Sequence, residues 1–385
     1  MIAKNELHAA DLYDMSLKTL QSHLSLDING YRCSSEMALS ALVKAALDNS
    51  SLNAVCDDLD GLADANTIRE HLNSALDVSE LAQQECEMNA ALAAGLPHEL
   101  ARAGMEVAID FHDEPFYGKT DEARTYSCRD RAKKGTTRFI RIASASVIWR
   151  GLRLTLALTY VLPEYSTLQV LQRLLQRLSH LGIRPGVLYL DKGFCHGEVI
   201  RYLQAQKQPS VLACPIRGKQ NGGTRALCRG RKSYRTRYTF TDGTEAEMAV
   251  VATLPRGKHG RRRRRKWLLF VLIELDWTLK VVMRCYRRRF GIECTYRQMR
   301  QLRVVSSSRN PAMKFFLLGL SLTLVNLWAR LRWQLFRRVG RGPRTVMADA
   351  FRLKRFISML RRAIETRFNA VMAVHTTAPP QIVNY

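Results

Sequence analysis

The stretch that decides the fold is Tyr286-Arg-Arg-Arg-Phe-Gly-Ile-Glu293-Cys-Thr-Tyr-Arg-Gln-Met-Arg300. It contains no proline and a single glycine, which predicts one helix over about residues 281 to 303. At about 100° per residue, Arg289, Glu293 and Arg300 all fall within about 60° of Tyr286. One carboxylate therefore shares a helix stripe with two guanidiniums and a phenol. A surface row of ion pairs has the same pattern, so the meaning of the stripe depends on the rest of the chain.

Charge is unevenly distributed along the 385 residues, whose formal net charge is +26. Residues 1–105 contain 6 Lys and Arg against 16 Asp and Glu, so the rest of the chain carries the whole basic excess. A basic body with an acidic head predicts a polyanionic partner for the body, most simply a nucleic acid. Ribosomal-type proteins and binders of anionic membranes share such a charge, but they usually have fewer long apolar strands.

The nine cysteines form no Cys-x-x-Cys pair and no Cys/His cluster, which argues against structural zinc and against a disulfide framework. Their odd number and the lack of a signal peptide predict a reducing, cytoplasmic location. The longest apolar run, residues 315–329, is shorter than the ~20 residues that cross a bilayer. It is also interrupted by polar residues, so it predicts a buried helix.

Residues 1–104 are predicted to form a helical N-terminal domain, because apolar residues recur there at helical spacing. Within it, residues 51–59 and 65–72 have the pattern of a helix-turn-helix around Gly61. Acidic residues surround this segment and would repel phosphate, so a helical hairpin that binds no DNA fits equally well. The exposed face of the second helix would carry Asn66, Thr67, Arg69 and Asn73.

Strands dominate from residue 105 onward. Three β-rich segments come first in hairpin order, and strands then alternate with amphipathic helices. This order predicts an α/β fold with a ribonuclease H-like mixed sheet in a catalytic domain over 105–385. The strands are expected at 106–112, 137–149, 152–162, 186–191 and 210–214, and the helices at 166–181 and 196–206.

Residues 216–278 interrupt this order and predict a β insertion, with strands at 234–240, 245–254 and 267–275. A basic helical C-terminal part is expected over 304–385. The insertion also contains six consecutive cations. Such a run is usually a solvated tail, but its place between two strands favours a loop that follows DNA phosphates. The run consists of Arg261, Arg262, Arg263, Arg264, Arg265 and Lys266.

Three carboxylates are candidate metal ligands: Asp110, Asp191 and Glu293. The first two each close a short apolar strand. If these strands are neighbours, the two acids lie too close together to stay ionised without a cation. Two Mg²⁺ ions about 3.5–4 Å apart would relieve that repulsion and form a phosphoryl-transfer site, and oxygen-only ligands suit Mg²⁺. Asp113 and Glu114 are alternative ligands, disfavoured because they fall in a predicted proline-containing turn.

Taken together, these residues resemble the DDE transposases of prokaryotic insertion sequences. The resemblance covers about residues 105–330 and is carried by Asp110, by Leu190-Asp191-Lys-Gly-Phe194, and by Tyr286-x2-Arg289-x3-Glu293-x6-Arg300. The last motif is similar to that of the Tyr-Arg-Glu-Lys signature branch. Within that branch, Arg289-Phe-Gly-Ile-Glu293 and Ser308-Arg-Asn-Pro311 resemble the archaeal-type group.

The resemblance implies a ribonuclease H-like fold with a β insertion, and Mg²⁺-dependent cut-and-paste transposition of terminal inverted repeats. A dimer bound to double-stranded DNA in a prokaryotic cytoplasm is the implied state. The resemblance assigns catalysis, and the binding of Mg²⁺ or Mn²⁺, to Asp110, Asp191 and Glu293. A ribonuclease H-like nuclease without strand transfer, and a derivative that only binds DNA, are the alternative functions.

The resemblance assigns binding of the transposon end to Tyr286, Arg289 and Arg300. Arg300 stands where the signature has lysine, which keeps the charge but replaces a point charge with a planar fork. Related insertions use a tryptophan to stack a flipped base at a hairpin intermediate. Trp267 is the candidate here and Trp277 the alternative, although a tryptophan on a strand is more often part of the core.

Overall fold

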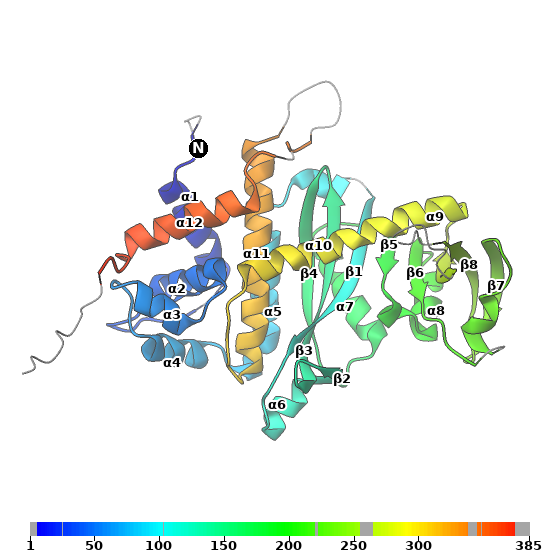
Figure 1. The fold of residues 1–385 in the computed structure, drawn as a ribbon, viewed down its shortest axis with the longest axis horizontal. Helices are drawn as coiled ribbons and strands as arrows, with labels where there is room; N and C mark the ends of the chain where they lie inside the picture. Colours follow the sequence, from blue (N-terminus) through cyan, green and yellow to red (C-terminus); the bar gives the residue numbers. More distant parts are fainter. Residues whose placement is uncertain are drawn as a thin grey trace, which may run out of the picture.

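A nine-stranded mixed sheet forms the centre of the protein (Figure 1). The computed structural model describes residues 6–24, 26–102, 104–219, 222–254, 265–337, 345–347 and 349–373, without the side chains of 102, 122–123, 288 and 290–294. The strands are β1 (Met105–Pro115), β2 (Cys128–Lys133), β3 (Thr136–Trp149), β4 (Leu152–Val161), β5 (Pro185–Leu190), β6 (Ser210–Cys214), β7 (Tyr234–Thr239), β8 (Glu245–Thr253) and β9 (Lys266–Ile273).

Helices α1 to α5 precede this sheet in the chain, and α6 to α12 lie between or after its strands. They are α1 (Ala9–Gln21), α2 (Ser35–Asp48), α3 (Leu52–Asp58), α4 (Ala65–Ala75), α5 (Leu81–Ala93), α6 (Asp121–Thr125), α7 (Thr167–His180), α8 (Gly197–Ala205), α9 (Leu279–Tyr286), α10 (Phe290–Met299), α11 (Pro311–Leu335) and α12 (Leu353–Arg367). The 3₁₀ turns η3 (Lys192–Phe194), η6 (Arg287–Arg289) and η7 (Arg300–Leu302) lie near the site described below.

The strand order confirms the ribonuclease H-like prediction. β4, β3 and β1 are neighbours in antiparallel hairpin order, and β1, β5 and β6 continue the sheet in parallel. Parallel neighbours need a crossover connection, and α8 provides one between β5 and β6. The predicted β insertion is confirmed too, and it extends the same sheet, because β9 pairs antiparallel with β6 and is followed by β8 and β7.

Strand β1 is longer than the sequence predicts. The expected turn after residue 112 is wrong, because Asp113, Glu114 and Pro115 pair with Arg141, Ile140 and Phe139 of β3. Proline is tolerated there because it is the last residue of its strand. The antiparallel partner therefore carries β1 three residues past the end of its apolar run.

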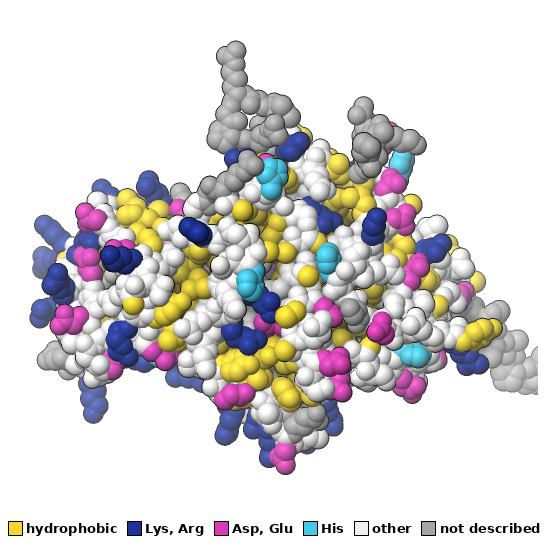
Figure 2. All heavy atoms as spheres, turned by 180° about the vertical axis from the view of Figure 1, so that it is seen from behind, with side chains coloured by type: hydrophobic (Ala, Val, Ile, Leu, Met, Phe, Trp, Pro, Cys, Tyr) yellow, Lys and Arg dark blue, Asp and Glu magenta, His cyan; other side chains and the backbone are white. Residues whose placement is uncertain are grey.

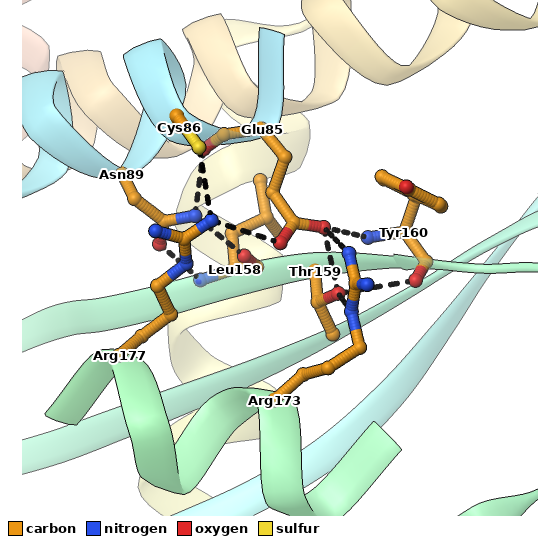
Figure 3. A network of polar contacts seen from close by, with 8 residues as sticks. All are labelled: Glu85, Cys86, Asn89, Leu158, Thr159, Tyr160, Arg173 and Arg177. Atoms are coloured by element: carbon orange, nitrogen blue, oxygen red, sulfur yellow. Dashed lines mark hydrogen bonds and ion pairs between the residues drawn. The ribbon is translucent and has the colours of Figure 1, made fainter. Parts of the chain in front are cut away.

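The outer edge of β4 is closed by side chains instead of by another strand. Asn326 of α11 accepts a hydrogen bond from the Thr155 amide at 2.9 Å and donates one to the Thr155 carbonyl at 2.7 Å. Asn89 of α5 does the same at Leu158, at 2.8 and 2.7 Å (Figure 3). Each amide thus satisfies a donor and an acceptor that an edge strand would otherwise leave open.

A buried carboxylate completes this edge (Figure 3). Glu85 accepts hydrogen bonds from the Tyr160 amide at 3.1 Å and from the Thr159 hydroxyl at 2.7 Å. Its charge is balanced by Arg173 at 2.9 Å and Arg177 at 3.5 Å, both on α7. These bonds join α5, β4 and α7, so the last long helix before the sheet is part of the sheet's own packing.

We expect Asn326→Ala to lower the free energy of unfolding by about 3 kcal/mol, because it leaves the Thr155 amide and carbonyl buried without partners. Urea or thermal unfolding measures the loss. Asn73→Ala on α4 is the control, since Asn73 is exposed and surface substitutions change stability little. Equal stability of the two variants would show that the Asn326 amide does not stabilise the β4 edge.

The apolar run forms α11, as predicted, and lies in the core. The helix is long and apolar enough to cross a membrane by length and composition, yet its most apolar window is completely buried inside the protein. Asn310 caps its first turn by accepting from the amides of Ala312 and Met313, and Pro311 occupies the first helical position.

The acidic head is partly neutralised inside the molecule. Helix α12 packs on α1 and α2, and it contributes Arg361 to Asp48 at 2.5 Å and Arg367 to Glu36 at 3.4 Å. Residues 368–371 also bond to the backbone of residues 58–61, the turn between α3 and α4. Helices α3 and α4 occupy the predicted helix-turn-helix segments. DNA binding by them, and the boundary at residue 104, stay predictions.

Candidate active site

Asp110 and Asp191 lie side by side at the centre of the sheet. Ile109 of β1 pairs with Leu190 of the parallel neighbour β5, and each carboxylate residue comes next in its strand's direction. The Asp110 side chain is 16% exposed and that of Asp191 is 36% exposed. Two acids that are distant in the sequence are therefore brought together by strand pairing alone.

One guanidinium bridges the two carboxylates. Arg289 Nη1 lies 3.1 Å from Asp110 Oδ2, and Arg289 Nη2 lies 3.4 Å from Asp191 Oδ1. The arginine side chain is 8% exposed, and its guanidinium also lies 5.4 Å from the centre of the Tyr286 ring. A planar fork is suited to bridging two oxygen acceptors in this way.

The prediction of one continuous helix over residues 281 to 303 is wrong in detail. Helices α9 and α10 are separated by the 3₁₀ turn η6, and the segment ends in a second such turn, η7. In a 3₁₀ turn, residues three apart lie above one another. Tyr286 and Arg289 are spaced in this way, which explains why the guanidinium rests against the phenol ring.

The carboxylates share an environment that favours binding of a cation. Burial and the nearby Asp191 carboxylate together raise the pKa of the Asp110 carboxyl to about 6, against the opposing effect of Arg289. Two acids this close are stabilised by positive charge between them. Arg289 provides that charge here, in the position expected for a metal ion, and the oxygen donors match those that Mg²⁺ prefers.

Helix α10 is anchored on the Asp110 strand. The Tyr296 hydroxyl lies 2.8 Å from Ser144 Oγ, and it donates to the Asp110 carbonyl at 3.4 Å. Glu293 is part of α10, but its side chain lies outside the described residues. Among the side chains that the structure describes, no group of three His, Cys, Asp or Glu could hold a metal ion.

Two cavities open on the carboxylate pair. One, of about 720 Å³, is built by β6, β8, β9 and α9, and the other, of about 820 Å³, is built around β2, β3 and the end of β4. The first brings five predicted residues together, and Trp277 is not among its described lining residues. These five are Asp110, Asp191, Trp267, Tyr286 and Arg289.

The other predicted DNA-binding residues are not among the described residues that line this cavity. Arg300 is exposed in η7. Arg261, Arg262, Arg263 and Arg264 lie outside the described residues. Arg265 donates to the Gly230 carbonyl at 2.8 Å, and Lys266 is exposed at the start of β9. The phenol of Tyr286 is buried and donates to the Leu190 carbonyl at 3.3 Å, next to Asp191.

The two alternative carboxylates are engaged by arginines. Asp113 is bound by both arms of the Arg141 fork, at 2.7 and 3.1 Å, and Glu114 is paired with Arg303. Neither partner is shared with Asp110. Asp110 is paired as well, but it shares Arg289 with Asp191, and this sharing of one cation by two carboxylates favours Asp110 over its neighbours as a metal ligand.

His112 has a structural role. Its ring stacks on Tyr296 with centroids 4.8 Å apart, and burial lowers the pKa of His112 to about 4, an effect that Arg300 increases. Between pH about 6.5 and 4, the unfolded chain therefore binds a proton that the folded protein does not bind. Acidification through this window must weaken folding.

We accordingly expect His112→Phe, which keeps an aromatic stack on Tyr296, to retain more stability on acidification. On going from pH 7 to pH 4.5, the variant should lose about 2 kcal/mol less of its free energy of unfolding than wild type loses. Urea unfolding at the two pH values measures it. His180→Gln, at an exposed position on α7, is the control. A wild-type pH dependence in His112→Phe would contradict this role.

Sequence reasoning missed β2 and the arginines around the larger cavity. Arg124, Arg129 and Arg138 line that cavity together with the carboxylates. Only Cys128 of β2 is buried, so the strand has no apolar alternation that could have revealed it. The density of Lys and Arg after residue 118 was the available signal.

Comparisons with known proteins identify a family and a similar fold. The family model described as "Transposase DDE domain" matches residues 107–327. Among solved structures, a piggyBac transposase synaptic complex with hairpin DNA is similar, with a TM-score of 0.56 and 10% sequence identity. The alignment covers 95% of this chain and 80% of that one. A search of curated proteins finds no match.

At this identity, the structural likeness establishes the fold alone. The family match spans more than half of the chain and includes Asp110, Asp191 and Glu293. The Tyr-Arg-Glu-Lys branch and its archaeal-type group stay predictions. On the strength of the family match, this chain belongs to the DDE transposase domain family.

Proposed function

We propose that this chain is a DNA transposase that cuts and joins the terminal inverted repeats of an insertion sequence by two-metal phosphoryl transfer. The observation that carries the proposal is the pairing of Asp110 with Asp191 around a bridging cation, Arg289. Such a pair is suited to hold divalent metal ions.

Asp110 and Asp191 would hold Mg²⁺, with Mn²⁺ as an alternative, and Glu293 would complete the ligand set. Glu293 lies four residues after Arg289 and three before Tyr296, and both of these side chains contact Asp110. Residues at these helical spacings share a face. Bound Mg²⁺ supplies activation of the attacking hydroxyl and stabilisation of the leaving oxygen.

The remaining site residues would position the DNA. Once a metal ion neutralises the two carboxylates, the Arg289 guanidinium would bind the phosphate at the cut end of the DNA. Guanidinium forks bind phosphate as well as carboxylate. Tyr286 would hold Arg289 in place through its ring. Trp267 lines the same cavity and offers a stacking surface for a base. Arg300 and the run Arg261 to Lys266 would contact backbone phosphates.

Cut-and-paste transposition requires two element ends to be handled together, so we propose that the chain acts as a homodimer on DNA in a prokaryotic cytoplasm. The decisive assay supplies uncut ends or pre-cut ends in separate reactions, each with target plasmid and Mg²⁺. Joining of the ends to the plasmid supports a transposase. Cleavage of uncut ends without joining would identify a nuclease, and binding without either reaction would identify a DNA-binding derivative.

A further inference from the structure

A basic hairpin projects from the catalytic sheet beside the larger cavity. We call residues 128–138 the basic arm; it consists of β2, the turn at Lys134 and Gly135, and the start of β3. Residues 117–141, which include it, contain eight Lys or Arg against three Asp or Glu. Figure 2 shows Lys and Arg side chains gathered at the lower end of the molecule, where Figure 1 places α6 and β2. The exposed cations of the arm are Arg129, Arg131, Lys133 and Lys134.

The arm is held in a defined shape. Lys133 pairs with Thr136 across a two-residue turn, in which Lys134 and Gly135 both have positive φ, 52° and 77°. The Tyr117 hydroxyl donates to the Lys134 carbonyl at 2.7 Å. These contacts present the cations as a fixed array, unlike the charges on a solvated tail.

Internal ion pairs leave most of this charge available. Asp130, the acid within β2, is paired with Arg141 at 2.7 Å. Lys133 lies 3.7 Å from Asp113, which the Arg141 fork already binds. The net charge of the exposed face is therefore positive, which favours a polyanion.

The arm lies on the opposite side of the carboxylate pair from Tyr286 and Trp267. In the sheet, β2 and β3 are on one side of β1 and β5, whereas β6, β8 and β9 are on the other. The 820 Å³ cavity extends from Asp110 and Asp191 to Arg129 and Arg138. The 720 Å³ cavity extends from the same acids to Tyr286 and Trp267.

An in-line phosphoryl transfer brings the attacking and leaving oxygens to opposite sides of the phosphorus. This reasoning rests on the proposed function, in which the element end occupies the side of Tyr286 and Arg289. We infer that the basic arm binds the phosphate backbone of the DNA beyond the scissile bond. That DNA is the flank during cutting and the target during joining. Because contacts to phosphate carry no sequence information, binding there should be independent of sequence.

The register of the strands gives the distance from the carboxylates to the tip of the basic arm. Asp110 pairs with Ser144, and Lys133 pairs with Thr136, eight residues further along β3. At about 3.3 Å per residue, the tip of the arm lies roughly 26 Å along the sheet from the carboxylates. A DNA strand advances about 3.4 Å per nucleotide, so the arm should contact about the first eight base pairs beyond the cleavage point.

The test measures binding in EDTA, where no cleavage occurs. Duplexes carry the terminal repeat with 0, 4 or 12 base pairs of arbitrary flank, and fluorescence anisotropy gives the affinity over a range of salt. Wild-type affinity should rise with flank length. The variant Arg129→Gln/Arg131→Gln/Lys133→Gln/Lys134→Gln should bind the flankless end as wild type does and lose that gain. On the long flank, its salt slope should fall by about 0.9 for each lost phosphate contact.

A matched control removes four exposed cations from α12 and the residue before it: Arg352→Gln/Lys354→Gln/Arg355→Gln/Arg362→Gln. This control should keep the flank-dependent gain. The inference is overturned if the arm variant keeps the gain, if wild type shows none, or if the arm variant loses affinity for the flankless end equally. A second assay, the joining of pre-cut ends to plasmid, then separates flank binding from target binding. If the arm contacts target DNA, the arm variant should join fewer ends than wild type. The binding test does not depend on catalysis. A protein that binds ends but never joins them would refute the proposed function, while the flank-length measurement would still decide whether the arm binds flanking DNA.

Discussion

Asp191→Asn should reduce Mg²⁺-dependent nicking of an end-containing duplex by at least roughly a thousandfold, while binding of that duplex stays close to wild type. A metal ion contributes several kcal/mol to the stabilisation of a phosphoryl-transfer transition state, and each 1.36 kcal/mol is about tenfold in rate. Asparagine preserves the shape of the residue but not the charge that the metal needs. A gel assay of nicked product measures the rate, and gel shift measures binding.

Asp130→Asn is the matched control, because Asp130 lines the larger cavity with Asp191 but pairs with Arg141. It should nick at nearly the wild-type rate. Full nicking by Asp191→Asn would refute the assignment of this carboxylate as a metal ligand. Asp113→Asn addresses the alternative ligand in the same assay, and its activity should persist.

The second large effect concerns Arg289. In the metal-free protein, Arg289→Met should lower the free energy of unfolding by about 3 kcal/mol above pH 6, because it leaves two neighbouring carboxylates with no cation between them. Divalent metal should then bind more tightly than in wild type, since it no longer displaces a guanidinium. Calorimetric titration with Mn²⁺ and thermal melting with and without the metal measure both effects.

The pH limit follows from the raised pKa of Asp110, about 6. Below this value the carboxyl is protonated in the folded state, so losing Arg289 removes less stabilisation. Arg289→Lys is the control, because it keeps the charge while losing the fork. Its free energy of unfolding should lie between those of Arg289→Met and wild type. Unchanged Mn²⁺ affinity in Arg289→Met would show that the guanidinium and the metal do not compete.

Local patterns were enough for much of the fold. The apolar segments around Ile109 and Leu190 predicted two strands that end at acids, and the order of elements predicted which strands are neighbours. The run at residues 315–329 predicted a buried helix, and α11 is one. These predictions succeed because strand and helix periodicities are properties of neighbouring residues.

Predictions failed where a partner distant in sequence overrides the local pattern. Asp113 to Pro115 were expected in a turn but are strand, because β3 pairs with them. The helix over residues 281 to 303 was expected to be continuous, yet a 3₁₀ turn at Arg287–Arg289 interrupts it. Strand β2 was missed because its exposed side chains show no alternation.

By itself, the sequence determined which residues are proposed to carry the chemistry: Asp110, Asp191 and the Tyr286-to-Arg300 motif, each recognisable from its own segment. Only the tertiary structure decided that Arg289 lies between the two carboxylates and that two separate cavities open on them. The physical reason is that residue type and spacing act along the chain. The distance between Asp110 and a side chain 179 positions away depends instead on the register of β1 with β5 and on how α9 and α10 pack across them.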